Sequence, residues 1–494
     1  MDYSLLVATF QRASQGRKLP QQRLLYDCLR AAILDGTIGQ GSRLKASRAL
    51  AEELGMARNS VIYAYERLAD EGFVIATRHG TIVARVGIAQ THPSLEASNV
   101  SVELSRRVKG LYRDRQGVDE SAAFVSGVPA LDAFPLSQWR LCIERAWRTM
   151  SARHLGYGNT EGHPALRHAI ADYLKVSRGV RCTLEQVFIT DGTQTSLDLC
   201  ARLLADTQDN AWLENPGYNG ARAAFQSAGL QLVPVPVDID GLAPSPELWL
   251  RHPPKLIYIT PSHQYPLGSV MSLERRLQLI DHARQAGAWI IEDDYDSEFR
   301  RDGPPLSAVQ GLTEDAPVIY LGTFSKTLFP ALRLGYMVVP AHLATPMGMA
   351  MGQIARRGRV VEQVALADFM DSGQFALHLR RMRRLYAQRR DALQTALQKH
   401  LGAAITISGG AGGMHLSVRL NLALADTAVS EAAQRYSLVV PAISAYCLPG
   451  APGPQYNGFV LGYAGVPVEK MDSQVKRLAQ LIDELIRQDT HARV

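Results

Sequence analysis

The chain has 494 residues and a formal net charge of +6, so it is longer than one hydrophobic core usually supports and only mildly basic. It contains no apolar run of about eighteen residues and no basic segment at its start, which argues against a membrane-spanning helix and a secretory signal and favours a multidomain, cytoplasmic protein. Its five cysteines are widely scattered, a distribution that fits neither a disulfide framework nor a zinc site and predicts reduced thiols and no bound metal.

Two helices are predicted near the start of the chain. Apolar residues recur at helical spacing over 21–35, and a glycine-rich stretch follows at 36–41. A second helix is expected to begin near Ser47, whose side chain can cap its first turn, and to end at Gly55.

A third helix is predicted over 58–68, with polar residues at its exposed N-terminal end. Its buried side is expected to consist of Val61, Ala64, Tyr65 and Leu68. Two short apolar runs, 73–75 and 81–83, flank a basic segment at 77–80, a pattern typical of a two-stranded wing. Residues 1–85 are therefore interpreted as a helix, a helix-turn-helix and a wing.

This region resembles the winged helix-turn-helix of the GntR superfamily, above all in Ser47-Arg-Ala-Leu-Ala51, Arg58-Asn-Ser-Val61 and Glu71-Gly72. The resemblance implies that double-stranded promoter DNA is a partner, since helix N-termini and guanidinium groups suit phosphates and such a helix fits the major groove. The residues implied in DNA contact are Arg48, Arg58, Asn59, Ser60, Arg78, His79 and Gly80. One departure is Ala57, which cannot cap the recognition helix. The alternative, a helical protein-interaction module, leaves the basic wing without a role.

Residues 86–122 are predicted to form a linker, because they are rich in Gly, Pro, Ser, Asn and charges and show little periodicity apart from a short helical pattern over 102–111. The linker is basic. Its charged residues, which either contact DNA or form a solvated face, are Arg106, Arg107, Lys109, Arg113 and Arg115.

From 123 to 494, strand-like apolar runs alternate with helical patterns. The runs are 187–190, 211–213, 256–259, 289–291, 318–321 and 336–339. Such alternation predicts an α/β domain with a mostly parallel sheet and helices on both faces. Ligands bind at the carboxyl ends of the strands in such sheets, and here polar clusters follow those ends.

These clusters together supply the parts of a pyridoxal 5'-phosphate site. Lys326 is the candidate catalytic, Schiff-base lysine, since a lysine amine near hydroxyls and a guanidinium can form an imine with the cofactor aldehyde. Asp293, at the end of an apolar strand, is placed to bind the ring nitrogen, Tyr295 to reach the ring's phenolate oxygen and Tyr218 to stack on the ring. The phosphate needs amides at a helix start, hydroxyls and a guanidinium. Residues that offer these groups are Gly192, Thr193, Gln194, Thr323 and Arg333.

Each cluster alone is weak evidence, but their order and spacing are specific. Thirty-three positions separate Asp293 from Lys326, and seven more lead to Arg333, which resembles the fold-type-I aminotransferases. The resemblance implies a fold-type-I PLP-dependent transferase-like domain. It also implies that Tyr157 reaches the cofactor phosphate of the partner subunit, and hence a homodimer.

A winged helix followed by such a domain resembles the MocR-type regulators over nearly the whole chain, specifically in 260–268, 292–300 and 323–335. The resemblance implies a PLP-dependent DNA-binding transcription regulator that senses PLP itself or a small amino compound. Two positions argue against efficient turnover. Tyr265 stands where aminotransferases usually have an asparagine, and Val460 stands near the place of the arginine that clamps a substrate carboxylate.

The sequence leaves two alternative functions open. One is a catalytically active aminotransferase with an accessory DNA-binding domain, for which Arg419 either replaces the missing carboxylate clamp or is an exposed or structural arginine without that role. The other is a plain architectural DNA-binding protein, which has no use for Lys326 and its neighbours. The regulator interpretation predicts that a ligand amine displaces the Lys326 amine, with slow or absent turnover.

Overall fold

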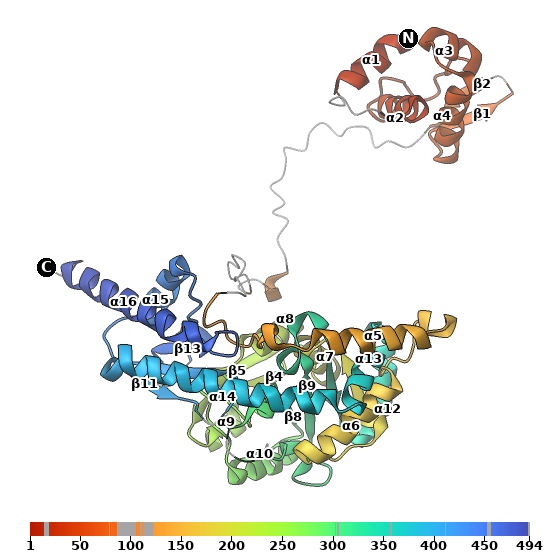
Figure 1. The fold of residues 1–494 in the computed structure, drawn as a ribbon. Helices are drawn as coiled ribbons and strands as arrows, with labels where there is room; N and C mark the ends of the chain where they lie inside the picture. Colours follow the sequence, from red (N-terminus) through yellow and green to blue (C-terminus); the bar gives the residue numbers. More distant parts are fainter. Residues whose placement is uncertain are drawn as a thin grey trace. The chain divides into compact units, whose positions relative to one another are not determined.

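The computed structural model describes two compact units of the chain, Met1–Glu103 and Leu104–Val494 (Figure 1). His79 and most of the predicted linker, including Lys109, Arg113 and Arg115, lie outside the described residues. The residues described are 1–13, 19–78, 80–85, 105–108, 111, 122–301, 303, 306–355, 358–410, 412–451 and 456–492.

The first unit consists of helices around one small core, followed by a two-stranded hairpin. The strands pair antiparallel, with Val74 opposite Val83 and Thr77 opposite Gly80. The predicted buried side of the third helix is confirmed, because all four of its residues belong to the core of this unit. The elements are α1 (Tyr3–Ala13), α2 (Gln21–Leu34), α3 (Ser47–Leu54), α4 (Arg58–Asp70), β1 (Val74–Thr77) and β2 (Gly80–Val83).

Two features of this unit differ from expectation. Ser47 is the first residue of α3 and does not cap it, because the cap position falls on Ala46, which has no side-chain oxygen. Helix α1 was not predicted. It is held against the unit by Tyr3 and Val7, which lie one turn apart and are buried.

The second unit contains an eight-stranded sheet in the order β3-β10-β9-β8-β7-β4-β5-β6. Neighbouring strands from β9 to β5 run parallel, whereas β10 is antiparallel to both of its neighbours and β6 is antiparallel to β5. The predicted mostly parallel sheet is therefore confirmed, and each of the six predicted strands is present. The strands are β3 (Val187–Thr190), β4 (Asn210–Asn215), β5 (Gln231–Asp238), β6 (Gly241–Leu242), β7 (Leu256–Ile259), β8 (Trp289–Asp294), β9 (Val318–Thr323) and β10 (Gly335–Val338).

Helices cover both faces of this sheet. One face packs against α7 (Thr193–Leu204), α8 (Asn219–Ala228) and α12 (Ala341–Ile354). The other face packs against α6 (Pro164–Arg178), α10 (Leu273–Ala286) and α14 (Gln374–His400). The remaining helices before α14 are α5 (Leu136–Thr149), α9 (Pro246–Arg251), α11 (Phe324–Thr327) and α13 (Val360–Asp371).

After α14 the chain builds a three-stranded antiparallel sheet in the order β11-β12-β13. The sequence patterns did not predict this sheet as a separate element. Its strands and flanking helices are β11 (Ile405–Ser408), β12 (His415–Leu420), α15 (Asp426–Ala433), β13 (Gly458–Gly462) and α16 (Val468–Ala492).

Part of the predicted linker packs on the second unit. Within the segment 102–111, for which a short helix is predicted, the described residues form a 3-10 turn, η1 (Arg106–Val108). The Gln226 amide of α8 donates to the Arg107 carbonyl at 3.2 Å. All five cysteines are free, as expected, and three of them are buried. Among the described residues no helix is both long and apolar enough to cross a membrane.

Candidate functional site

A cavity of about 250 Å³ lies in the second unit, where the segments that follow β3, β4, β7, β8 and β9 meet. We call it the strand-end cavity. Eight of the ten predicted cofactor-site residues line it, all but Gly192 and Tyr157, together with others from distant parts of the chain. The lining residues are Ser126, Gly127, Thr193, Gln194, Tyr218, Tyr258, Tyr265, Asp293, Tyr295, Asp296, Thr323, Ser325, Lys326, Pro330, Arg333, Met414 and His415.

Lys326 lies on α11, directly after the buried strand β9. The Thr323 hydroxyl accepts a hydrogen bond from the Ser325 amide at 3.2 Å and so caps this short helix. The Lys326 amine donates to the Gly127 carbonyl at 2.7 Å. Gly127 has a φ of 76°, a left-handed conformation that favours glycine, and a Cβ there would lie 2.6 Å from the Lys326 amine. The amine is thus held at the cavity wall by a glycine about two hundred residues away.

Asp293 presents an unused carboxylate oxygen. The side chain is only 4% exposed, and its Oδ2 accepts a hydrogen bond from the Tyr258 hydroxyl at 2.8 Å. Its Oδ1 is buried and has no hydrogen-bond partner among the described residues. Burial raises the pKa of Asp293 to about 7, against the lowering effect of the Tyr258 hydrogen bond. A buried acceptor of this kind fits the protonated nitrogen of a pyridine ring.

Of the three consecutive carboxylates at the end of β8, Glu292, Asp293 and Asp294, one lies at the cavity and two lie in the core. Strand alternation places Glu292 and Asp294 away from Asp293. Glu292 accepts hydrogen bonds from the backbone amides of Val309 and Gln310, at 2.8 and 3.0 Å. Asp294 forms a buried ion pair with Arg178 at 2.6 Å. Only Asp293 of these three carboxylates lines the cavity.

The opposite part of the cavity is suited to a phosphate. Helix α7 begins at Thr193 without a side-chain cap, so amide groups of its first turn have no partner within the helix. Arg333 adopts a φ of 51°, and a Cβ on Gly192 would lie 3.9 Å from its Nη1. The guanidinium group therefore lies close to the start of α7, as an anion site needs.

Three tyrosines form much of the remaining wall. The Tyr295 hydroxyl donates to the His263 carbonyl at 2.8 Å and lies 3.0 Å from His263 Nδ1. The Tyr265 hydroxyl lies 2.9 Å from that of Tyr446. The ring of Tyr218 is perpendicular to that of Tyr265, with centroids 6.0 Å apart. Tyr265, which stands where the resemblance to aminotransferases leads us to expect an asparagine, is therefore hydrogen-bonded to a second tyrosine, Tyr446.

Several lining residues were not predicted. His415 comes from β12, its Nε2 lies 3.2 Å from the Pro266 carbonyl, and burial lowers its pKa well below the usual value. Asp296 lies 3.1 Å from His263 Nδ1. Tyr258 offered a sequence signal, because it is the one hydroxyl in an otherwise aliphatic strand. His415 and the glycine that binds Lys326 offered none.

Other predicted positions lie elsewhere. Tyr157 is 79% exposed and does not line the cavity of its own chain. Arg419 is exposed on β12, opposite Gly458 of β13. Val460 is buried and pairs with Ser417. Arg333 is therefore the one arginine among the described residues that line the strand-end cavity.

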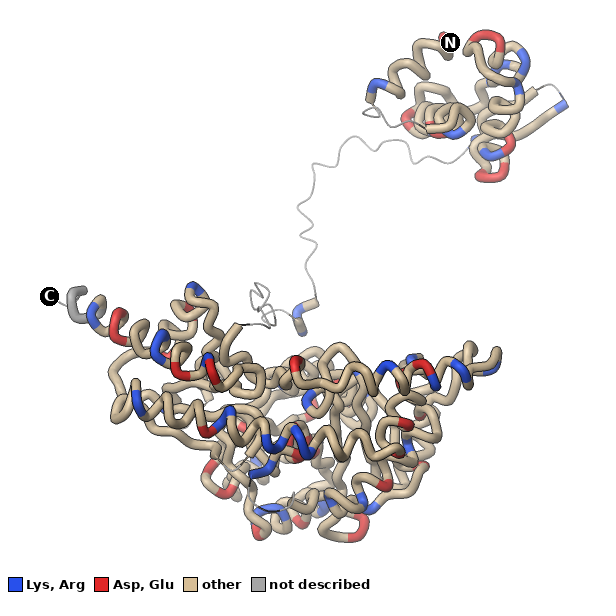
Figure 2. The backbone as a smooth tube through the Cα atoms, in the orientation of Figure 1, with Lys and Arg blue, Asp and Glu red and all other residues tan. Residues whose placement is uncertain are grey.

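In the first unit, the predicted DNA-contact residues lie at helix starts and at the hairpin. Arg48 is exposed in the first turn of α3, and Arg58 and Asn59 are exposed at the start of α4, with Ser60 half-buried beside them. Neither helix has a side-chain cap. Arg78 and Gly80 are exposed at the end of the hairpin, and Figure 2 shows the basic position at its tip. The sequence patterns did not single out Arg43, whose side chain packs against Gly80.

Comparison with known families assigns both units. Residues 127–478 match the family described as Aminotransferase class I and II, and residues 16–83 match the gntR family of bacterial regulatory proteins.

Whole-chain relatives share this arrangement. The chain is 40% identical over 472 residues to a probable rhizopine catabolism regulatory protein, MocR, of Rhizobium meliloti, covering 93% of each chain. It is 32% identical over 440 residues to PdxR, an HTH-type pyridoxine biosynthesis transcriptional regulator of Corynebacterium glutamicum, covering 89% of this chain and 91% of PdxR. Among solved structures, α-aminoadipate aminotransferase LysN of Thermus thermophilus, complexed with N-(5'-phosphopyridoxyl)-L-leucine, matches with a TM-score of 0.70 and 26% identity, covering 78% of this chain and 98% of LysN.

Proposed function

The chain belongs to the MocR-type transcription regulators, and from that premise we propose that it binds pyridoxal 5'-phosphate through Lys326 and that PLP or a small amino compound at this site changes its affinity for promoter DNA. The observation that carries the proposal is the strand-end cavity, which combines a lysine amine, an unsatisfied buried carboxylate oxygen and an uncapped helix start beside an arginine.

Each of these groups suits one part of the cofactor. Pyridoxal 5'-phosphate, when bound, supplies an aldehyde carbon that bonds to a primary amine. Lys326 offers the amine, Asp293 holds a proton on the ring nitrogen, and the start of α7 with Arg333 and Thr323 binds the phosphate. Tyr218 and Tyr295 contribute aromatic wall and hydroxyl groups.

DNA contact is proposed for the first unit. The uncapped starts of α3 and α4 leave backbone amides for phosphate oxygens, and Arg48 and Arg58 lie beside these amides. The start of α4 suits the major groove, and the hairpin end with Arg78 and Gly80 suits the backbone or minor groove. His79 belongs to the same proposal from sequence alone.

Replacing Arg58 with alanine is expected to weaken operator binding by about 1–3 kcal/mol if the arginine reads a base, or to reduce the salt dependence of binding if it contacts phosphate. Affinity should be measured as a function of salt concentration. Arg23→Ala is the matched control, because Arg23 is an exposed arginine on α2 engaged with Asp27. Unchanged affinity and salt dependence in Arg58→Ala would remove that residue from the interface.

A homodimer is proposed for the second unit. Helices α5 and α13 pack together at one end of this unit (Figure 1), and Val360 of α13 lies next to Gly158. Large apolar side chains are exposed on these helices and on adjacent segments, and exposed apolar surface is what an interface between two copies buries. These side chains are Leu136, Leu141, Trp147, Leu155, Tyr157, Met349 and Ile354. Burial of this surface against a second copy would bring Tyr157 toward the partner's cavity.

A sensor suits this cavity better than an efficient transaminase. Within one chain, Arg333 is the one lining arginine described, and we assign it to the phosphate. An amino acid would then have no guanidinium fork for its carboxylate, so its Cα–H bond would be poorly oriented for deprotonation. A ligand amine that took the place of the Lys326 amine on the cofactor would leave this side chain free to donate to the Gly127 carbonyl, as it does in the cofactor-free structure, so the two states would differ in their contacts.

One experiment tests the proposal with three readouts on the same full-length protein: cofactor absorbance, DNA affinity and keto-product release. With a candidate amine, we expect a prompt absorbance change and a shift of DNA affinity of about 5- to 150-fold, the usual range of coupling between sites, with slow or absent product release. Rapid multiple turnover with DNA affinity indifferent to the amine would instead establish the aminotransferase alternative.

A further inference from the structure

The second unit contains another cavity, of about 340 Å³, between α14, the segment that follows β8 and the three-stranded sheet. We call it the arginine cavity. Its charged lining consists of Glu298, Arg300, Arg301, Arg383 and Arg390. None of these residues lines the strand-end cavity. Nothing assigned to the cofactor or to DNA explains why four arginines meet here.

Arg390, which lines this cavity, has a buried donor without a hydrogen-bond partner among the described residues. Its residue is 5% exposed, and its Nε is buried with no hydrogen-bond partner among the described residues. Its Nη1 lies 3.3 Å from an Asp391 carboxylate oxygen. Its Nη2 lies so close to Gly410 that a Cβ there would be 2.7 Å away. A buried guanidinium donor without an acceptor is costly, which favours an anion as the missing partner.

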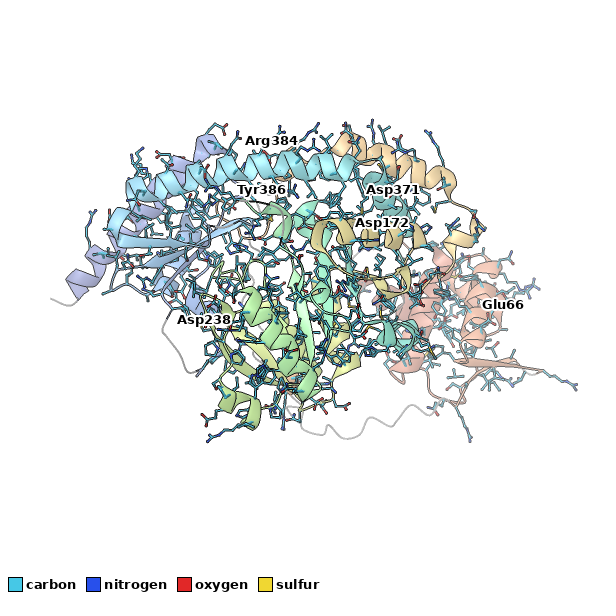
Figure 3. All side chains as sticks on the ribbon, turned by 90° about the horizontal axis from the view of Figure 1, so that it is seen from below. Glu66, Asp172, Asp238, Asp371, Arg384 and Tyr386 are labelled. Carbon is cyan, nitrogen blue, oxygen red and sulfur yellow. The ribbon has the colours of Figure 1, made fainter. Side chains whose placement is uncertain are left out.

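The other arginines are arranged around the same space. Arg383 Nε donates to the Glu298 carbonyl at 2.6 Å, which fixes this guanidinium beside the segment after β8. Arg301 lies 3.7 Å from Asp391, on the exposed side of the cavity. Figure 2 shows the cluster of basic positions along α14. In Figure 3, Arg384 points away from the unit on the outer side of α14, whereas Tyr386 lies on the inner side.

Two acidic side chains, Glu298 and Asp391, lie near these arginines among the described residues. Glu298 Oε1 accepts a hydrogen bond from the Tyr173 hydroxyl at 3.1 Å, and its Oε2 is buried without a partner among the described residues. Burial, assisted by the charge of Asp294, raises the pKa of Glu298 to about 7, so this carboxyl is partly protonated near neutral pH. Asp391, outside the lining, lies 3.7 Å from Arg301 and 3.3 Å from Arg390. Among the described residues, Glu298 is the one acidic side chain in the lining, beside four arginines.

We propose that the arginine cavity binds a small anion that carries a phosphate or carboxylate group. Guanidinium forks match the oxygens of both groups, and the buried Nε of Arg390 supplies a donor that lacks an acceptor. The volume lies at the lower end of the range of small-molecule sites. This site goes beyond the proposed cofactor function and does not depend on it.

The test is calorimetric titration of the full-length, PLP-loaded protein, desalted to remove excess cofactor, with inorganic phosphate and separately with succinate at constant ionic strength. Saturable binding of at least one probe is expected, and the stronger probe identifies the preferred oxyanion. Arg390→Gln is expected to reduce that affinity about tenfold or more, the effect of losing hydrogen bonds to a charged group. Arg383→Gln, on a more exposed arginine, provides the same test if Arg390→Gln does not fold.

Arg384→Gln is the matched control on the outer side of α14 and should leave binding unchanged. Arg333→Gln separates the two cavities, because it removes the proposed cofactor-phosphate arginine and should not affect the new site, even if the chain carries no PLP. Absence of saturable binding by both probes, or binding lost in Arg333→Gln but kept in Arg390→Gln and Arg383→Gln, would overturn the proposal.

Discussion

Lys326→Ala is expected to abolish covalent attachment of pyridoxal 5'-phosphate. Lys326 is the lysine that lines the strand-end cavity, and its amine is positioned by the Gly127 carbonyl at 2.7 Å. No other amine described in the cavity wall can bond to the cofactor aldehyde. The measurement is borohydride reduction of the PLP-treated protein, followed by mass and absorbance of the peptide that contains residue 326.

Noncovalent binding is expected to persist in this variant, because the phosphate and ring-nitrogen contacts come from other residues. Lys175→Ala, at an exposed lysine of α6, serves as the control and should keep the full covalent yield. Cofactor still fixed to Lys326→Ala would place the attachment elsewhere and would overturn the assignment of this cavity.

The strands predicted most accurately were those whose own residues are almost all apolar, so that their burial can be inferred from the local sequence. Strands β3 and β7 begin and end where predicted, because a short apolar run is bounded by polar or turn-forming residues on both sides. Strand β8 was predicted only to Ile291, although it continues to Asp294. Its last three residues are carboxylates whose burial depends on partners from other elements, and no local pattern reveals those partners.

Strand β5 was missed for a different reason. It contains Pro234 and Pro236, which lack the amide hydrogen that a central strand needs. The structure accommodates them because β5 pairs along its length with β4 but with β6 only at Val237 and Asp238. The alternating valines are buried while the prolines occupy the intervening positions. The prolines are tolerated because β5 has a neighbour along its whole length on one side only, and this depends on the order of strands in the sheet, which the local sequence does not show.

The sequence predicted those residues of the candidate site whose side-chain type alone indicates a chemical role. A lysine, an aspartate and an arginine at a specific spacing indicate a cofactor, and they do meet in one cavity. The glycine that positions the lysine and the histidine from β12 could not be predicted, because their residue types indicate nothing until the chain brings them together. Ser47 was wrongly predicted as the helix cap because α3 begins one residue earlier than expected, and helix propensities do not fix a helix end to a single residue.

Asp293→Asn is expected to weaken cofactor binding and to stabilise the cofactor-free protein at alkaline pH. Burial raises the pKa of Asp293 to about 7 in the folded chain, well above its usual value. The pKa of this carboxyl is about 4 in the unfolded chain and about 7 in the folded chain. Between these two pH values the folded state therefore binds more protons at this site than the unfolded state. The free energy of unfolding consequently falls as the pH rises through this window, and the full loss is present above it.

The size of the effect follows from the pKa difference. At about 1.4 kcal/mol for each pKa unit, the ionised carboxylate destabilises the cofactor-free fold by roughly 4 kcal/mol at most. Asparagine keeps an acceptor for the Tyr258 hydroxyl and carries no charge. Chemical denaturation of both cofactor-free proteins at about pH 5, inside this window, and at about pH 8, above it, should show a gain for Asp293→Asn that is clearly larger at the higher pH.

Cofactor binding should respond in the opposite direction. A neutral amide cannot hold a proton on the ring nitrogen as a carboxylate does, so PLP affinity is expected to fall by about 10- to 150-fold, corresponding to a lost hydrogen bond between charged groups. Glu214→Gln is the control, because the pKa of Glu214 is also raised to about 7 by burial, while its carboxylate binds Thr260 and Gln264 and does not line the cavity. A stability gain in both variants, with PLP affinity reduced only in Asp293→Asn, would separate the general cost of a buried carboxylate from the specific use of this one. Equal PLP affinity in Asp293→Asn and the parent would show that the unsatisfied oxygen of Asp293 serves something other than the ring nitrogen.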